Sequence, residues 1–260
     1  MNILICNDDG IHSNGIITLV NTFKSKGHKV FLVAPASEKS AQSHAITIRE
    51  ALRVKQYDEN SWSVSGSPVD SVLIALEHLL HEKKIDLVIS GINAGQNIGD
   101  DVLYSGTVAV AVEAMCLGFK AIAISITSYE DQFFETASTI IDKLVDLQIY
   151  DLIGHRQLIN INVPNLPLSE IKGLRICKTG FRRYQNIVHQ DKDHRNRDIF
   201  WIGGDSPIWE EYNENIDGYL VKNAIVAISP LKVDYNDYQM HKTYIDFLEK
   251  NKEQLNFWHS

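Results

Sequence analysis

An apolar run that leads directly into two adjacent aspartates is the part of this sequence best suited to chemistry. Residues 3–6 (Ile-Leu-Ile-Cys) precede Asn7, Asp8, Asp9 and Gly10. A short apolar run that stops at turn residues indicates a buried strand, and ligands of open α/β sheets bind just beyond the carboxyl ends of such strands. Two carboxylates held together there repel each other unless a cation or a shared proton compensates, and a hard divalent metal is the natural cation. A turn in which Asp8 is the cap and Asp9 faces solvent fits these residues equally well.

Three more polar segments follow predicted strands and therefore belong near the same edge of the sheet. Residues 34–44 bring hydroxyls, a lysine and a histidine. Residues 90–101 contain Gly91, Gly95 and Gly99 with the amides Asn93 and Asn97, so that backbone N–H groups can cradle an anion and amide oxygens can bind a metal. Residues 104–107 (Tyr-Ser-Gly-Thr) open a predicted helix, where hydroxyls and free N–H groups form an anion site or only a cap. Each segment alone can be a solvated loop or a cap, and their common location favours a site.

The pattern of apolar residues predicts how these segments are positioned. Strand-like runs alternate with helical periodicity up to about residue 165, which predicts a mostly parallel sheet with helices on both faces. The expected strands are 2–6, 29–33, 61–64, 85–90, 121–126 and 157–163, and the expected helices are 14–25, 69–80, 105–117 and 131–147. Beyond residue 165 we expect strands at 171–178, 187–189, 199–202 and 218–228, a polar hairpin tip at 191–198 and an amphipathic helix at 239–251.

Composition excludes several classes of function. The chain has 260 residues and a net charge of −8, which argues against binding to nucleic acid polymers and to anionic membranes. Its three cysteines are widely spaced and form no CxxC pair, so a reducing cytoplasm is the expected compartment. The first residues lack the basic segment of a signal peptide, and no apolar run approaches the length of a membrane span.

The four segments together resemble the SurE family of survival protein E nucleotidases. The resemblance lies in the motifs Asn-Asp-Asp-Gly-Ile-His at 7–12, Ala-Pro at 34–35 with Ser40 and His44, Gly-Ser-Pro-Val-Asp at 66–70, Ser-Gly-Ile-Asn-Ala-Gly at 90–95, Gly-Asp-Asp at 99–101 and Tyr-Ser-Gly-Thr-Val at 104–108. It implies a metal-dependent phosphatase that acts on nucleoside 5′- and 3′-monophosphates, and on short polyphosphate as well.

Carried over position by position, the resemblance also implies roles for individual residues. The ligands of one divalent cation, Mg²⁺ or Mn²⁺, fall on Asp8, Asp9, Ser40 and Asn93, and the two aspartates are the expected catalytic groups. The expected phosphate or substrate contacts are Asn7, Asn97, Ser105, Gly106 and Thr107.

For the fold, the resemblance implies an α/β chain with a Rossmann-like three-layer catalytic core and a smaller C-terminal part. We place the core at residues 1–165. We place a β-rich oligomerisation region, with a protruding arm and a terminal helix, at residues 166–260. The expected partners are the nucleoside monophosphate and further copies of the chain, in a homodimer or homotetramer.

Three other functions stay open as alternatives. A phosphoaspartyl phosphatase would use one aspartate as a nucleophile, although such sites usually space their acids as Asp-x-Asp. A sensor or scaffold protein would bind metal and nucleotide without turnover. A dinucleotide-dependent oxidoreductase would need a glycine-rich turn where Asp8 and Asp9 stand.

Overall fold

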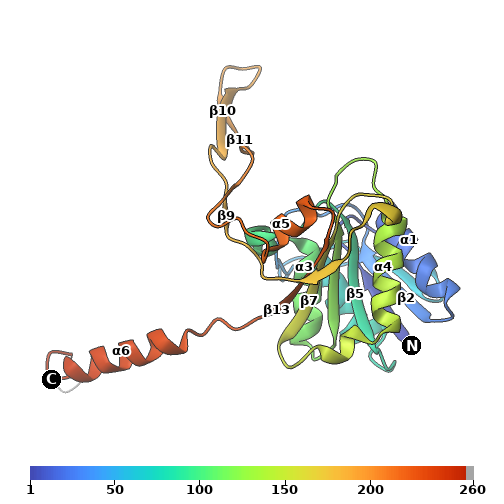
Figure 1. Cartoon of the computed structure of the whole chain (residues 1–260), viewed down its shortest axis with the longest axis horizontal. Coiled ribbons are helices and arrows are strands. Elements are labelled where there is room, and N and C mark those ends of the chain that lie inside the picture. Colours follow the sequence, from blue (N-terminus) through green and yellow to red (C-terminus); the bar gives the residue numbers. More distant parts are fainter. Residues whose placement is uncertain (256–260) are drawn as a thin grey trace.

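The computed structural model describes residues 1–255, which fold around one mixed sheet with helices on both faces (Figure 1). Within these residues the sheet has nine strands in the order β3-β4-β2-β1-β5-β6-β7-β13-β8. Their bounds are β1 (Asn2–Cys6), β2 (Lys29–Pro35), β3 (Val54–Asp58), β4 (Ser61–Val64), β5 (Leu87–Ala94), β6 (Ala121–Ile126), β7 (Gln157–Val163), β8 (Leu174–Ile176) and β13 (Val226–Lys232). All neighbours from β4 to β7 are parallel, whereas β3 and β13 run antiparallel to β4 and β7. The predicted α/β fold with a mostly parallel sheet is confirmed.

Helices cover both faces of this sheet and complete three layers. The helices are α1 (Asn14–Ser25), α2 (Pro68–Ile74), α3 (Gly106–Cys116), α4 (Phe134–Asp146), α5 (Asp217–Lys222) and α6 (Tyr238–Lys250). Both faces of β1 are buried. Ile3 and Ile5 pack in the core under α1 and α4. Leu4 and Cys6 pack in the core on the other face, under α2 and α3. A strand buried on both faces reads as a continuous apolar run. None of the helices in residues 1–255 is long and apolar enough to cross a membrane.

The order of the strands places a crevice beside β1. The chain passes from β1 to β2 on one side, and later returns to the other side of β1 as β5. This reversal is a topological switch point, where loops at the carboxyl ends of the two strands diverge and ligands of open α/β sheets bind. Asp8 and Asp9 follow β1 at this point, and Asn93 lies at the end of β5.

Two of the predicted elements differ from the structure. Residues 218–228, expected to be a strand, form α5 and then enter β13 after a turn in which Ala224 has a φ of 62°. Tyr219 and Val221 give the segment a strand-like composition, but Asp217 accepts the N–H of Gly218 at the start of the helix. The expected helix 69–80 is present but changes type, because α2 ends at Ile74 and continues directly as a π-helix, Ala75–Leu79.

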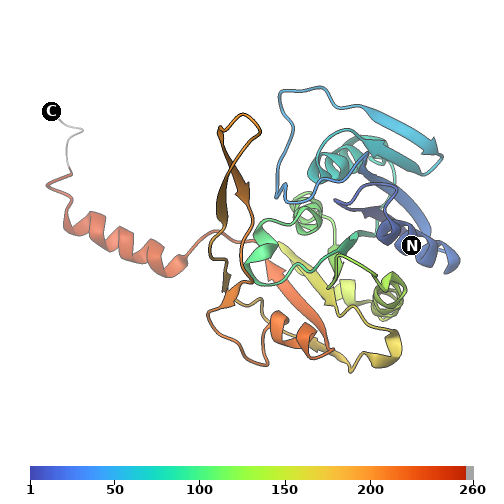
Figure 2. The ribbon, with the colours of Figure 1, turned by 90° about the horizontal axis from the view of Figure 1, so that it is seen from above.

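The C-terminal part both completes the sheet and extends away from it. β13 pairs with β7, and β8 pairs with β13, so two strands beyond residue 165 belong to the central sheet. Between them the chain builds a projecting hairpin of β10 (Val188–Lys192) and β11 (Asp198–Ile202), joined to the body through the short pair β9 (Arg182–Arg183) and β12 (Ile208–Trp209). Figures 1 and 2 show this arm and α6 projecting from the body in different directions. Residues 256–260, the end of the expected C-terminal region 166–260, lie outside the described residues.

Candidate active site

The turn after β1 fixes the position of the two aspartates. Asn7 is fully buried, and its side chain holds the turn by accepting the N–H of Gly10 at 3.1 Å and donating to the carbonyl of Gly10 and to Ser13 Oγ. Gly10 has a φ of 97° and lies against the backbone of Ser37, so a side chain there would be strained and crowded. The structure therefore places Asn7 beneath the turn that carries Asp8 and Asp9, with its side-chain amide bonded to Gly10 and Ser13.

Asp8 lies at the amino-terminal end of α3. The residue is 4% exposed, and its Oδ1 accepts a hydrogen bond from the hydroxyl of Thr107. Burial raises the pKa of Asp8, while hydrogen bonds from the hydroxyl and the backbone N–H of Thr107 favour the carboxylate. The partial positive charge at a helix N-terminus adds to this stabilisation. Thr107, expected to contact phosphate, donates its hydroxyl to Asp8 in the structure and thereby orients the carboxylate.

Gly106 lets the helix approach Asp8 this closely. A Cβ at residue 106 would stand 2.8 Å from both Cβ and Oδ2 of Asp8, which is closer than packed atoms allow. We expect Gly106→Ala to displace the Asp8 carboxylate and to lower kcat/KM by about 100-fold, since a shift of about 1 Å in an active site has that effect.

Two comparisons make the Gly106→Ala result specific. Ala is the better helix former, so the melting temperature should change little. Gly203→Ala is the matched control, because a Cβ there would meet no atom within 4 Å. Full activity in Gly106→Ala, or an equal loss in Gly203→Ala, would contradict the role given to Gly106.

Asp9 is the second carboxylate of the pair and is held less deeply. Its Oδ2 accepts the backbone N–H of Ala94, at the end of β5, at 3.2 Å. Burial and the neighbouring charge of Asp8 raise the pKa of Asp9 to about 6. The salt bridges within residues 1–255 include neither aspartate, so the two negative charges have no cationic side chain beside them.

The raised pKa of Asp9 predicts how the stability of the metal-free protein depends on pH. Between the ordinary value of 3.8 and about 6, the folded state binds more protons at Asp9 than the unfolded state does. The contribution of Asp9 to the free energy of unfolding therefore rises as the pH falls from about 6 to 3.8. Above about pH 6 the ionised side chain destabilises the fold, and Asp9→Asn removes that effect.

The measurement is thermal unfolding of both proteins in EDTA across this pH range. Asp9→Asn should melt above the wild type at about pH 7, and the difference should close as the pH falls towards about 4. Melting curves that differ by a constant amount at every pH would contradict the prediction.

Five of the expected site residues line one cavity of about 260 Å³ at the switch point, and they are Asp8, Ser40, Asn93, Asn97 and Ser105. Asn93 donates its Nδ2 to the carbonyl of Gly95 at 2.6 Å. The oxygen of the same amide is an acceptor that could bind a cation. Ser40 is exposed and donates to Glu38 Oε1 at 2.9 Å. Asp9 is adjacent through its bond to Ala94, another lining residue.

These donors fit a hard divalent cation. Within residues 1–255 no three His, Cys, Asp or Glu side chains form a metal-binding group, so a cation at Asp8 and Asp9 would draw its remaining protein ligands from neutral oxygens. The hydroxyl of Ser40 and the amide of Asn93 stand beside the same cavity. An all-oxygen set with two carboxylates suits Mg²⁺ or Mn²⁺, and a soft thiolate-binding metal finds no ligand among these residues.

Asn97 and Ser105 are fixed by the neighbouring strands and helix. The backbone N–H of Asn97 donates to Asn162 Oδ1 at 2.8 Å, and its side chain donates to Ser125 Oγ at 2.8 Å. Asn160 completes this group by donating to the carbonyl of Asn97. Ser105 accepts the N–H of Val108 as the cap of α3, lines the cavity, and donates its O–H to no other group within residues 1–255.

The sequence did not indicate every residue of the cavity. Tyr129 and Tyr184 also line it, and neither lies in one of the four polar segments named above. Tyr184 lies in the arm after β9, in a region without a recognisable motif. Tyr129 reaches the cavity through a contact that only the folded chain shows, because Gly95, with a φ of 114°, lies directly against its ring.

Comparisons with known proteins agree with this geometry. The model of the family described as survival protein SurE matches residues 3–186. A protein named 5′-nucleotidase SurE from Haemophilus influenzae (strain PittGG) is 41% identical over 250 residues, which are 96% of this chain and 98% of that protein. One of the same name from Histophilus somni (strain 2336) is 42% identical over 252 residues, covering 96% and 100%.

A solved structure gives the same result for the fold. The crystal structure of the SurE protein from Aquifex aeolicus superimposes with a TM-score of 0.83 at 34% identity and covers 96% of this chain and 100% of that one. The resemblance drawn from the motifs is confirmed, and the chain belongs to the SurE family.

Proposed function

We propose that this chain is a phosphomonoesterase that hydrolyses nucleoside 5′- and 3′-monophosphates with one divalent cation per subunit, Mg²⁺ or Mn²⁺, and that short polyphosphate is a further substrate. The observation that carries the proposal is the pair Asp8 and Asp9. Both carboxylates have raised pKa values, and within the described residues neither has a cationic partner. The names of the relatives, 5′-nucleotidase, support the substrate class.

The cation site that we propose consists of Asp8, Asp9, Ser40 and Asn93. A bound cation would neutralise the non-bridging oxygens of a phosphate and lower the pKa of a bound water. Thr107 donates to the carboxylate of Asp8, and Asn7 fixes the turn that carries both aspartates. Such preorganisation matters because a site assembled in advance does not have to reorganise during the reaction.

The phosphate contacts that we propose are Asn97 and Ser105, whose remaining N–H and O–H donors border the cavity. Gly106 and Thr107 contribute indirectly, since both act on Asp8. We assign to one of the two catalytic aspartates the task of orienting the attacking water.

The test is phosphate release from a panel of 5′- and 3′-nucleoside monophosphates and tripolyphosphate, with Mg²⁺ or Mn²⁺ and again with EDTA. We expect release that requires the cation, and the panel then ranks the substrates. Folded protein that binds a nucleotide with either cation and returns it unchanged would instead indicate a sensor.

We further propose that the chain works in the cytoplasm as a homodimer or homotetramer assembled through its C-terminal region. Support for assembly comes from the apolar side chains exposed on the two projecting elements, among them Phe200 and Trp201 on β11 and Phe247 on α6. All three cysteines are free, which fits a reducing compartment. Light scattering of the full chain tests the assembly, and a monomer at all concentrations would contradict it.

A further inference from the structure

Three tyrosines surround the cavity that holds the proposed cation and phosphate sites. Tyr104 precedes α3, Tyr129 follows β6, and Tyr184 belongs to the arm, and all three line the same cavity as Asp8 and Asn97. The side chains of Tyr104 and Tyr129 are 62% and 76% exposed, although large aromatic groups usually gain stability from burial. Within residues 1–255 no hydrogen bond involves the hydroxyl of either one.

Tyr184, the third tyrosine, is held in place by its neighbours. Tyr184 donates its hydroxyl to Asp101 at 2.8 Å, and the guanidinium of Arg182 lies 5.6 Å from the centre of its ring. Arg182 in turn forms an ion pair with Asp101. The ring of Tyr184 is therefore fixed at the cavity, and the charge of Asp101 is compensated. Burial raises the pKa of Tyr184, and the nearby guanidinium of Arg182 acts in the opposite direction.

Tyr129 is placed by a glycine in the loop that follows β5. A side chain at Gly95 would collide with its ring, so the absence of a Cβ lets the ring lie on the loop that carries Asn93 and Asn97. An exposed aromatic ring seated on a glycine, at the edge of the cavity where we propose the phosphate contacts, has the position needed to stack on a group attached to that phosphate.

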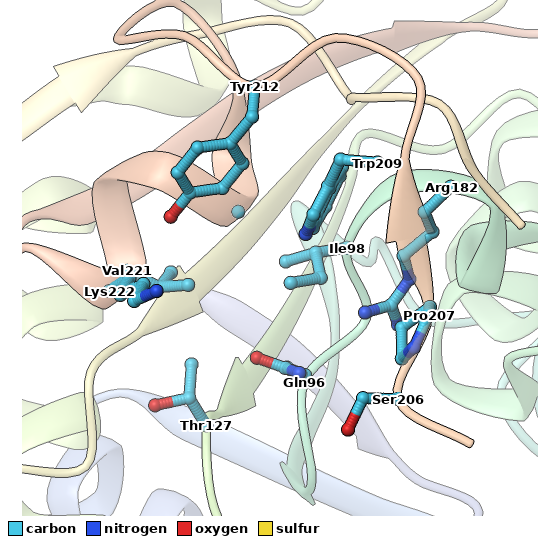
Figure 3. A pocket seen from close by; sticks show the side chains of 11 residues that line it. Gln96, Ile98, Thr127, Arg182, Ser206, Pro207, Trp209, Tyr212, Val221 and Lys222 are labelled. Carbon is cyan, nitrogen blue, oxygen red and sulfur yellow. The ribbon is translucent and has the colours of Figure 1, made fainter.

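A neighbouring cavity also has aromatic walls, but its rings are already used by the fold. This cavity of about 570 Å³ shares Gln96 with the first one and contains Trp209, Tyr212 and Lys222 (Figure 3). Trp209 packs against Gly180 and Gly218 and lies under Arg182, whose guanidinium is 5.5 Å from its ring. Tyr212 packs between Trp209 and Tyr219, at ring distances of 6.0 and 5.5 Å. These contacts leave the first cavity as the better aromatic surface for a ligand.

We infer that Tyr104, Tyr129 and Tyr184 form the surface on which the base of a nucleoside monophosphate stacks, and that they determine the preference for nucleotides over other phosphate esters. The inference rests on the proposed function for the phosphate half of the substrate. Stacking on aromatic side chains accepts every base because each base has a π-face, so the surface suits a broad range of nucleotides.

The test compares two substrates that differ only by the base, AMP and ribose 5-phosphate. Loss of a stacking ring weakens base binding by about tenfold or more. In the double variant Tyr104→Ala/Tyr129→Ala we expect KM for AMP to rise about tenfold and kcat to change by less than about twofold. The kinetic constants for ribose 5-phosphate should stay within about twofold of the wild type, because that substrate has no ring to stack.

Two further variants separate the ring from other effects. Tyr129→Phe keeps the ring and should behave as the wild type does. Tyr212→Ala removes a ring from the neighbouring cavity and should leave KM for AMP unchanged. An equal loss on both substrates in the double variant, or a rise in KM for AMP in Tyr212→Ala, would overturn the inference.

Equilibrium binding of adenosine, which carries no phosphate, gives a readout independent of turnover. Weaker binding to a folded double variant supports the stacking surface even if no phosphate is released from any substrate. Adenosine that binds equally to both proteins, or to neither, overturns the inference. Absent phosphate release would contradict the proposed function alone, so the two failures are distinguishable.

Discussion

Asp8→Asn should reduce phosphate release from nucleoside monophosphates by on the order of 10³-fold or more, because a cation at a phosphoryl group is worth several kcal/mol of transition-state stabilisation. The amide keeps the shape of the side chain and can still accept the hydroxyl of Thr107, but it removes one of the two charges that would hold the cation. The fold should survive, since burial raises the pKa of Asp8 and the neutral amide no longer carries a buried charge.

The control for Asp8→Asn is an aspartate at the opposite end of the same sheet. Asp86 precedes β5 and accepts the N–H of Asn2 at 2.8 Å, a bond that an asparagine can also accept. Asp86→Asn should keep activity within about twofold of the wild type. Initial rates with saturating Mg²⁺ and Mn²⁺ make the comparison. Turnover by well-folded Asp8→Asn at the wild-type rate would disprove the cation site.

Asp217→Ala should destabilise the protein by on the order of 3–5 kcal/mol. The side chain is fully buried and accepts the backbone N–H groups of Gly99 at 2.8 Å, Gly180 at 3.1 Å and Gly218 at 2.8 Å. Each donor left unpaired in the interior costs about 1–3 kcal/mol. For a chain of this size the melting temperature should fall by roughly 6–20 °C.

The same substitution should also lower activity, because Gly99 belongs to the loop that carries Asn97 and Asp101. Asp198→Ala is the matched control, since Asp198 pairs with Lys192 on the exposed hairpin, where an ion pair contributes about 0–1 kcal/mol. Thermal unfolding measures both variants. Equal melting temperatures for Asp217→Ala and Asp198→Ala would show that Asp217 does not anchor this loop.

The sequence predicted the parts of the fold that depend on local pattern. The apolar run of β1, its turn and the motif before α3 led to the correct edge of the sheet, because parallel strands bring their carboxyl ends together. Tyr219 and Val221 favour a strand, which α5 is not, and the helix begins at a buried aspartate, Asp217, whose tertiary contacts to the N–H groups of Gly99 and Gly180 no local pattern shows.

Roles that depend on contacts between distant residues could not be predicted in this way. Thr107 lies 99 residues from Asp8, and its hydroxyl is committed to that carboxylate, which no spacing along the chain shows. Asn7 stands next to the aspartates in sequence, yet its amide is used by the turn. Tyr184 reaches the cavity because its arm is tied to Asp101, and that contact exists only in the folded chain.

The position of β13 between β7 and β8 has a consequence for how the protein is made. β8 ends at Ile176 and joins the sheet only through β13, which begins at Val226. During synthesis the ribosome must therefore finish the whole arm before β7 can be covered on that side. An uncovered strand edge pairs readily with other chains, so a nascent chain stalled within the arm is expected to aggregate.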